Sequence, residues 1–224
     1  MSRSIESRFS ERTLIYIPIV HTPADMGALS ESVRLATFRK VGATGWKRKL
    51  NLIDKIWTTT ELAIDDLDLP YKTVRLYQDG LPVCGREAEL VTELAKSGSR
   101  NHRLLLRLIE RGASIVGTES LELLVEEYEL AKQTMAAGGS LKSAGMKAHQ
   151  KALSDSLLKR RDRFIADRIN TTLDNGETGI LFLGMLHSLE NRLDKDIHVI
   201  YPVNRPLNYG GKDNDSVQRP GSNR

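Results

Sequence analysis

Two apolar runs limit most strongly what this chain can fold into. The runs "TLIYIPIV" (13–20) and "ILFLG" (180–184) are apolar at nearly every position and have the length of a strand. A strand with one face in water alternates polar and apolar residues, whereas a continuously apolar strand is buried on both faces, as in a parallel sheet covered by helices. We therefore expect two central parallel strands. Proline cannot donate to a sheet, so Pro18 predicts that the first strand ends near Ile17 or bulges there.

Between and after these runs, helical and strand-like patterns alternate along the chain. Alternation of this kind predicts an α/β fold with a mostly parallel central sheet flanked by helices. Gly42 is expected to separate two helices within residues 24–68. Further helices are predicted at 85–97 and 100–111 and in two long stretches of 119–175, and further strands at 73–78, 113–119 and 196–203.

The predicted domain organisation is simple. Residues 13–203 form a single α/β domain, and the stretch 119–160 is too long for an ordinary crossover, so it predicts a helical insertion or lid hinged at Gly138 and Gly139. Residues 1–12 are polar and predict a flexible N-terminus. Residues 204–224 lack apolar side chains that could anchor them, so we expect a disordered C-terminal tail.

Composition restricts the partners and the compartment. The net charge of +4 comes from basic residues that are interleaved with acidic ones, a pattern typical of solvated helix surfaces, so binding of nucleic acid is not expected. Cys84 is the single cysteine, no signal-peptide pattern is present, and no apolar stretch is long enough to span a bilayer. We expect a cytoplasmic protein without a membrane partner, and the sequence leaves a homo-oligomer open.

Polar residues that follow the predicted strands suggest where chemistry takes place. In an open parallel sheet, ligands bind at the carboxyl ends of the strands. The first strand is followed by His21, the third by Glu119 and the fourth by His187. Polar residues follow strands in every protein because loops are polar. However, the chain has only 5 histidines, and two of them end its two most apolar strands.

An arginine interrupts an apolar helical stripe before the fourth strand. Residues recur every four positions along this stripe, and Arg161 lies in its middle: Leu153, Leu157, Arg161, Ile165 and Ile169. An unpaired buried guanidinium is very costly, so Arg161 requires a partner or a water-filled cleft. We expect it near the carboxyl edge of the sheet, with His21, Glu119 and His187.

These residues resemble the motifs of the TraB/Tiki family, which belongs to one superfamily with erythromycin esterase-like and ChaN-like haem-binding proteins. "GMLH" (184–187) resembles the family's Gly-x-x-His motif, and "PIVH" (18–21) takes the place of a first such motif, with Pro18 instead of glycine. Glu119 in "IVGTES" resembles the family's glutamate after an internal strand. Arg161 in "RDRFIADRI" resembles its helical Arg-Asn/Asp motif.

The resemblance implies an α/β fold with a helical insertion and a cleft lined by His21, Glu119, Arg161 and His187. Members differ in chemistry, since some are proposed metal-dependent proteases, some hydrolyse lactones and some bind haem. The function implied is hydrolysis of an ester, lactone or amide bond in a small-molecule or peptide substrate. The alternative is a non-catalytic protein on the same scaffold that binds a ligand, haem or metal, or regulates a partner.

Two mechanisms fit the four residues. In one, His21, Glu119 and His187 bind a divalent metal (Mn, Co or Zn) that activates water. In the other, Glu119 or a histidine acts as a general base without a metal, and Arg161 stabilises negative charge or holds a substrate carboxylate. Because a cation repels a metal ion, Arg161 favours an anionic or acyl substrate. Three residues were predicted as supporting acids around this site: Asp25, Asp79 and Glu190.

Overall fold

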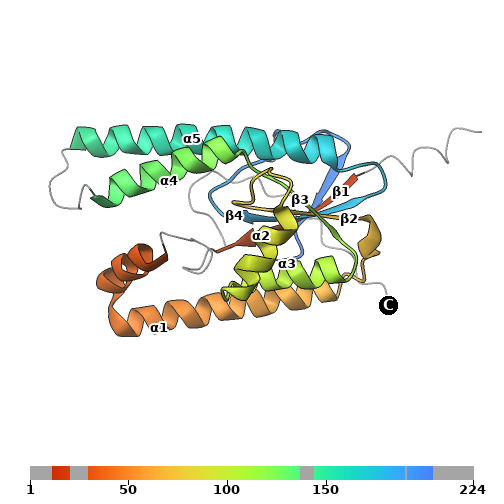
Figure 1. Cartoon of the computed structure of the whole chain (residues 1–224), viewed down its shortest axis with the longest axis horizontal. Coiled ribbons are helices and arrows are strands. Elements are labelled where there is room, and N and C mark those ends of the chain that lie inside the picture. The colour runs from red at the N-terminus through yellow and green to blue at the C-terminus, as the bar shows by residue number, and fades with distance from the viewer. Residues whose placement is uncertain (1–11, 21–29, 137–143, 190, 204–224) are drawn as a thin grey trace, which may run out of the picture.

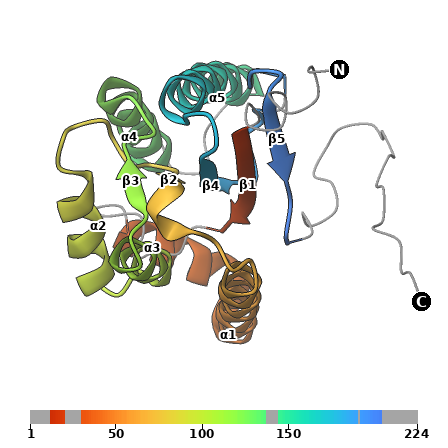
Figure 2. The ribbon, with the colours of Figure 1, turned by 90° about the vertical axis from the view of Figure 1, so that its right-hand side faces the viewer.

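Five parallel strands form the centre of the structure, in the order β3-β2-β4-β1-β5. The structure is a computed structural model that describes residues 12–20, 30–136, 144–189 and 191–203. All strand pairs are parallel, and Figure 2 shows the sheet with helices on both faces. The predicted α/β fold is confirmed. The strands are β1 (Arg12–Ile19), β2 (Val74–Gln78), β3 (Ser114–Val116), β4 (Thr178–Gly184) and β5 (Ile197–Ile200).

The two apolar runs of the sequence are neighbouring strands at the centre of this sheet. β1 pairs with β4 in continuous register from Thr13 to Ile19. The predicted end or bulge at Pro18 is therefore wrong. β5 pairs with β1 only as far as Ile15, so Pro18 lies where β1 has an unpaired edge, and sheets tolerate proline at such positions.

Helices cover the two faces of the sheet unequally. The helices are α1 (Ser30–Asp65), α2 (Glu87–Lys96), α3 (Arg100–Glu110), α4 (Leu121–Ala136) and α5 (Ala144–Thr172), with a short 3-10 helix at Tyr71–Thr73. The first three lie on one face, and α4 and α5 lie on the other (Figure 2). Trp57 of α1 and Leu105 of α3 belong to the core on the first face, and Ile165 of α5 belongs to the core on the second.

Gly42 kinks α1 into two helical segments, as the sequence predicts. Its φ of 67° lies in the left-handed region, which glycine adopts without steric cost. The segment after Gly42 follows the sheet, where Ile53, Trp57 and Ile64 are buried at helical spacing.

The stretch predicted as a helical insertion, 119–160, contains α4 and the first part of α5, which form an antiparallel pair. Together with the first part of α1, this pair extends past the carboxyl edge of the sheet (Figure 1). The end of α5 returns over the sheet and buries Ile165 and Ile169 against it, together with Leu173 just after the helix. The predicted hinge glycines, 138 and 139, lie outside the described residues, as do the termini at 1–11 and 204–224.

Turns flank His187 in the described part of the chain. Residues 185–186 and 191–192 form turns, and the His187 amide donates to the Gly184 carbonyl at 3.1 Å. A turn at this point directs the His187 side chain back under α5 instead of starting a new helix. Among the helices in the described part of the chain, none is long and apolar enough to cross a membrane.

Candidate active site

Arg161 of α5 binds three carboxylates at the carboxyl edge of the sheet. Its Nε donates to Glu119 Oε2 at 2.7 Å, and its Nη2 donates to Glu119 Oε1 at 2.5 Å and to Asp79 Oδ1 at 2.8 Å. Its Nη1 donates to Glu127 Oε1 on α4 at 2.5 Å. The apolar stripe predicted that Arg161 requires a partner, and these carboxylates fill that role. We refer to Arg161, Asp79, Glu119 and Glu127 as the Arg161 cluster.

Backbone hydrogen bonds hold Glu119 in place beyond the end of β3. Residues Pro82 and Glu119 form an isolated parallel bridge, in which the Val83 amide donates to the Glu119 carbonyl at 2.9 Å. The Gly80 amide donates to the Glu119 side chain, at Oε1, over 2.9 Å. The loop after β2 therefore positions both the backbone and the carboxylate of Glu119.

Asp79 connects the ends of β2 and β4. It begins the Asp-Gly turn after β2, where Gly80 has a φ of 76°. Its Oδ2 accepts a hydrogen bond from the Gly184 amide at 2.9 Å, while its Oδ1 accepts from Arg161. We predicted Asp79 as a supporting acid, and the structure places it at the centre of the site.

His187 lies beside this cluster and contacts a further acid, Asp162 of α5. Its Nδ1 is 2.6 Å from Asp162 Oδ1, and its Nε2 is 3.7 Å from Asp79 Oδ2. The other oxygen of Asp162 accepts from the Ser188 amide at 3.3 Å. The His187 side chain is only 5% exposed and that of Asp162 is 7% exposed, so the pair is held in a largely dry environment.

Glu119, Arg161 and His187, three of the four residues expected at the site, therefore belong to one continuous set of contacts. Asp79 joins them, since it contacts both the guanidinium and the imidazole. The fourth predicted residue, His21, and the supporting acids Asp25 and Glu190 lie outside the described residues. β1 ends at Ile19, in register with Gly184.

The cluster contains more carboxylates than cations. Burial raises the pKa of Glu119, and the negative charge of Asp79 raises it further, although the hydrogen bonds from Arg161 act in the opposite direction. Burial alone would lower the pKa of Arg161. Attraction to Glu119, Asp79 and Glu127 outweighs burial, so its pKa lies above the usual value and the guanidinium stays charged. Arg161 is thus a fixed positive charge among the acids.

Glu119, one of the predicted metal ligands, is paired with Arg161. Among the described residues, no three His, Cys, Asp or Glu side chains are placed to hold a metal ion. Both oxygens of the Glu119 carboxylate accept hydrogen bonds from Arg161, whose positive charge repels a metal cation. In this arrangement Glu119 does not fit the role of a metal ligand.

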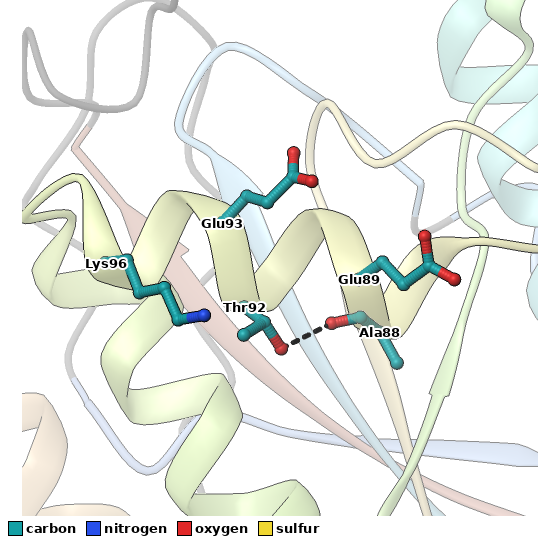
Figure 3. Close-up of a pocket in the computed structure, with 5 residues that line it drawn as sticks. All are labelled: Ala88, Glu89, Thr92, Glu93 and Lys96. Atoms are coloured by element: carbon teal, nitrogen blue, oxygen red, sulfur yellow. Dashed lines mark hydrogen bonds between the residues drawn. The ribbon is translucent and has the colours of Figure 1, made fainter.

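A hollow on α2 lies apart from this cluster. It has a volume of about 370 Å³ and is lined by five residues of α2: Ala88, Glu89, Thr92, Glu93 and Lys96 (Figure 3). The Thr92 hydroxyl donates to the Ala88 carbonyl at 2.8 Å within this hollow, as the dashed line in Figure 3 shows. α2 covers the face of the sheet opposite α5 (Figure 2), and none of the residues that line the hollow belongs to the Arg161 cluster.

Sequence reasoning missed two members of the site, Asp162 and Glu127. Asp162 heads a row of buried residues at helical spacing, with Ala166 and Ile169 of α5 four and seven positions later and Leu173, just past the end of α5, eleven positions later. That spacing could have identified Asp162 as buried. For Glu127 the sequence offers no comparable indication, because it lies among four glutamates of α4.

Comparison of the chain with protein-family models, with curated proteins and with solved structures gave no match. The resemblance to the TraB/Tiki family therefore stays a prediction that depends on the four short motifs.

Proposed function

We propose that this protein is a TraB/Tiki-like hydrolase that cleaves an ester, lactone or amide bond, with His187 as its general base. The contact between Asp162 and His187, at 2.6 Å, carries this proposal. A buried carboxylate bound to one nitrogen of an imidazole fixes its tautomer and orientation and stabilises the imidazolium that forms during proton transfer.

The proposed reaction uses water as the nucleophile. His187 Nε2, on the side of the ring away from Asp162, takes a proton from water as the oxygen attacks the carbonyl carbon. The tetrahedral intermediate collapses as the imidazolium returns the proton to the departing alcohol or amine. The products are a carboxylic acid and an alcohol or amine, or a hydroxy acid when the substrate is a lactone.

The Arg161 cluster supports this chemistry from beside the histidine. Asp79 is held by both Arg161 and the Gly184 amide, and it lies 3.7 Å from His187 Nε2. The negative charge of Asp79 therefore lies close to the nitrogen that takes up the proton. Arg161 keeps Asp79 and Glu119 in position and supplies positive charge near the developing oxyanion.

The metal-dependent variant of the proposal remains testable. A bound metal would have to take His187 and Asp79 as ligands, with further donors from other parts of the chain, and would supply an activated water. The general-base mechanism predicts that dialysis against a chelator leaves turnover unchanged. Loss of turnover on chelation, with recovery on adding Mn, Co or Zn, would favour the metal-dependent variant.

The main experiment is a hydrolysis assay with a matched pair of histidine variants. Purified protein is offered p-nitrophenyl esters, aliphatic lactones and anilides, and turnover is followed spectroscopically. His187→Gln is expected to lower kcat by about 100-fold or more, because general-base catalysis contributes roughly 10²–10⁴-fold. The control is His198→Gln, since His198 is an exposed histidine of β5.

Equal turnover by the two variants would overturn the proposal. The proposal would also be overturned if the wild-type protein hydrolysed none of these substrates. That result would favour the alternative, a non-catalytic protein that binds a ligand, haem or metal, or regulates a partner. Adding haem then distinguishes one form of that alternative, because a bound haem shows a Soret band.

A further inference from the structure

A groove between α4 and α5 leads to the Arg161 cluster. It has a volume of about 320 Å³, at the lower end of the range of ligand pockets, about 300–1,000 Å³. We call it the α4–α5 groove. Its lining residues are Glu127, Leu130, Ala131, Thr134, Met135, Ser154, Leu157 and Leu158. Five of these eight residues are apolar, and two others carry hydroxyl groups, so the wall suits an uncharged chain.

Glu127 is the charged residue of the groove and also a partner of Arg161. The three carboxylates that bind Arg161 differ greatly in exposure. The side chains of Glu119 and Asp79 are 0% and 3% exposed, whereas that of Glu127 is 49% exposed. The Glu127 side chain can therefore leave Arg161 and turn into water. The carboxylates of Asp79 and Glu119 would become buried unpaired charges if they left Arg161.

We propose that the α4–α5 groove binds a medium-chain carboxylate, whose head group replaces Glu127 on Arg161 Nη1 and whose apolar chain lies along the groove. The exchange substitutes one carboxylate for another, so the charge at Arg161 Nη1 is conserved. The guanidinium keeps a charge-assisted hydrogen bond, which is stronger than a neutral one. The apolar chain supplies the binding energy that favours the ligand over Glu127.

The length of the groove determines how long a hydrocarbon chain of the ligand it can hold. From Glu127 to Met135 the groove follows α4 over eight residue-to-residue steps, which is about 12 Å at 1.5 Å per residue. A saturated chain of about eight carbons spans most of this length. Acetate carries the same head group but reaches none of the apolar wall, and we expect it to bind much more weakly.

The role of the carboxylate as a reaction product rests on the proposed function, because hydrolysis of an acyl ester releases a carboxylate. A ligand of this class would be the acid product, or a substrate with a free carboxylate. The binding step itself does not require turnover, so it can be tested separately.

The test is calorimetric titration of the full-length protein with sodium octanoate below its micellar concentration. Octanamide, which has the same chain without the charge, and acetate, which has the charge without the chain, are the comparison ligands. We expect octanoate to bind at least tenfold more tightly than either. Equal affinity for octanoate and octanamide would overturn the proposal.

A matched pair of variants on α4 tests the exchange at Arg161. Glu127→Gln removes the competing carboxylate and is expected to tighten octanoate binding by about tenfold. Glu126→Gln is the control, because Glu126 is the neighbouring residue, is equally exposed at 49%, and pairs with Arg160 instead. Identical octanoate affinities of these two variants would overturn the exchange.

Two further variants separate this proposal from the hydrolase proposal. Ala131→Leu adds bulk inside the groove and is expected to weaken octanoate binding at least tenfold, with folding checked by circular dichroism. His187→Gln is expected to abolish turnover while octanoate still binds. If His187→Gln loses turnover but the wild type does not bind octanoate, the hydrolase proposal is retained and the proposal for the groove is wrong.

Discussion

Arg161 and Glu119 make a two-point contact across 42 residues of sequence, with Nε–Oε2 at 2.7 Å and Nη2–Oε1 at 2.5 Å. The guanidinium and the carboxylate are both buried. Through this contact α5 is anchored to the chain that follows β3, so the helical insertion is held against the carboxyl edge of the sheet. A bidentate pair in a dry environment is rigid, and its removal has consequences for both stability and function.

Arg161→Gln is expected to lower the free energy of unfolding by about 3–5 kcal/mol, because it leaves the buried carboxylates of Asp79 and Glu119 without their cation. Urea denaturation followed by circular dichroism measures the change. The neighbouring Arg160 provides the control, since its ion pair with Glu126 is about half exposed. Arg160→Gln is expected to change stability by about 0–1 kcal/mol. Similar losses in the two variants would contradict a buried role for Arg161.

The raised pKa of Glu119 predicts that its contribution to the free energy of unfolding falls as the pH rises. Between the usual value of 4.5 and the raised one, folded Glu119 keeps a proton that the unfolded chain has released. The folded state therefore binds more protons in this interval, and the contribution of Glu119 to stability falls as pH rises through it. Relative to Glu119→Gln, the wild type is expected to lose stability as the pH increases from 4.5. Urea denaturation at several pH values measures both proteins, and parallel curves would contradict the raised pKa.

Much of the fold follows from local patterns of the sequence. The apolar runs at 13–20 and 180–184 identified β1 and β4 as buried parallel strands, since such runs fit only a sheet that is covered on both faces. The stripe around Arg161 likewise identified a buried cation that required partners, because helical periodicity fixes which residues face the sheet.

The remaining parts of the site depend on contacts that no local pattern encodes. The sequence predicts Asp79 only as a supporting acid, because its bonds to Arg161 and Gly184 arise only when β2 and β4 pair. Glu127 reaches Arg161 only because α4 and α5 are antiparallel neighbours. Asp162 was overlooked because an acidic residue within a charged helix is usually solvated, whereas here His187 is its partner.

Asp162→Asn is expected to leave the fold intact and to lower kcat for ester hydrolysis by about 10²-fold or more, without a comparable change in KM. The amide has nearly the same shape as the carboxylate, but it cannot stabilise the imidazolium and it admits the wrong tautomer of His187. Steady-state kinetics with a p-nitrophenyl ester measures both constants. Asp167→Asn, at an exposed position of the same helix, is the control. An unchanged kcat in Asp162→Asn would contradict the role of Asp162.

Gly117→Ala is expected to destabilise the protein by about 1–3 kcal/mol, in the range of other overpacked sites. A Cβ at Gly117 would lie 2.7 Å from Val83 Cα and 3.0 Å from the Pro82 carbonyl oxygen, and backbone atoms cannot yield as a flexible side chain can. Separating these segments would also break the bridge between Pro82 and Glu119, so the variant should lose turnover as well as stability. Ser114→Ala, at an exposed position of β3, is the matched control and is expected to stay within about 0.5 kcal/mol of the wild type by urea denaturation. If Gly117→Ala proves as stable and as active as Ser114→Ala, the close approach at Gly117 does not position Glu119.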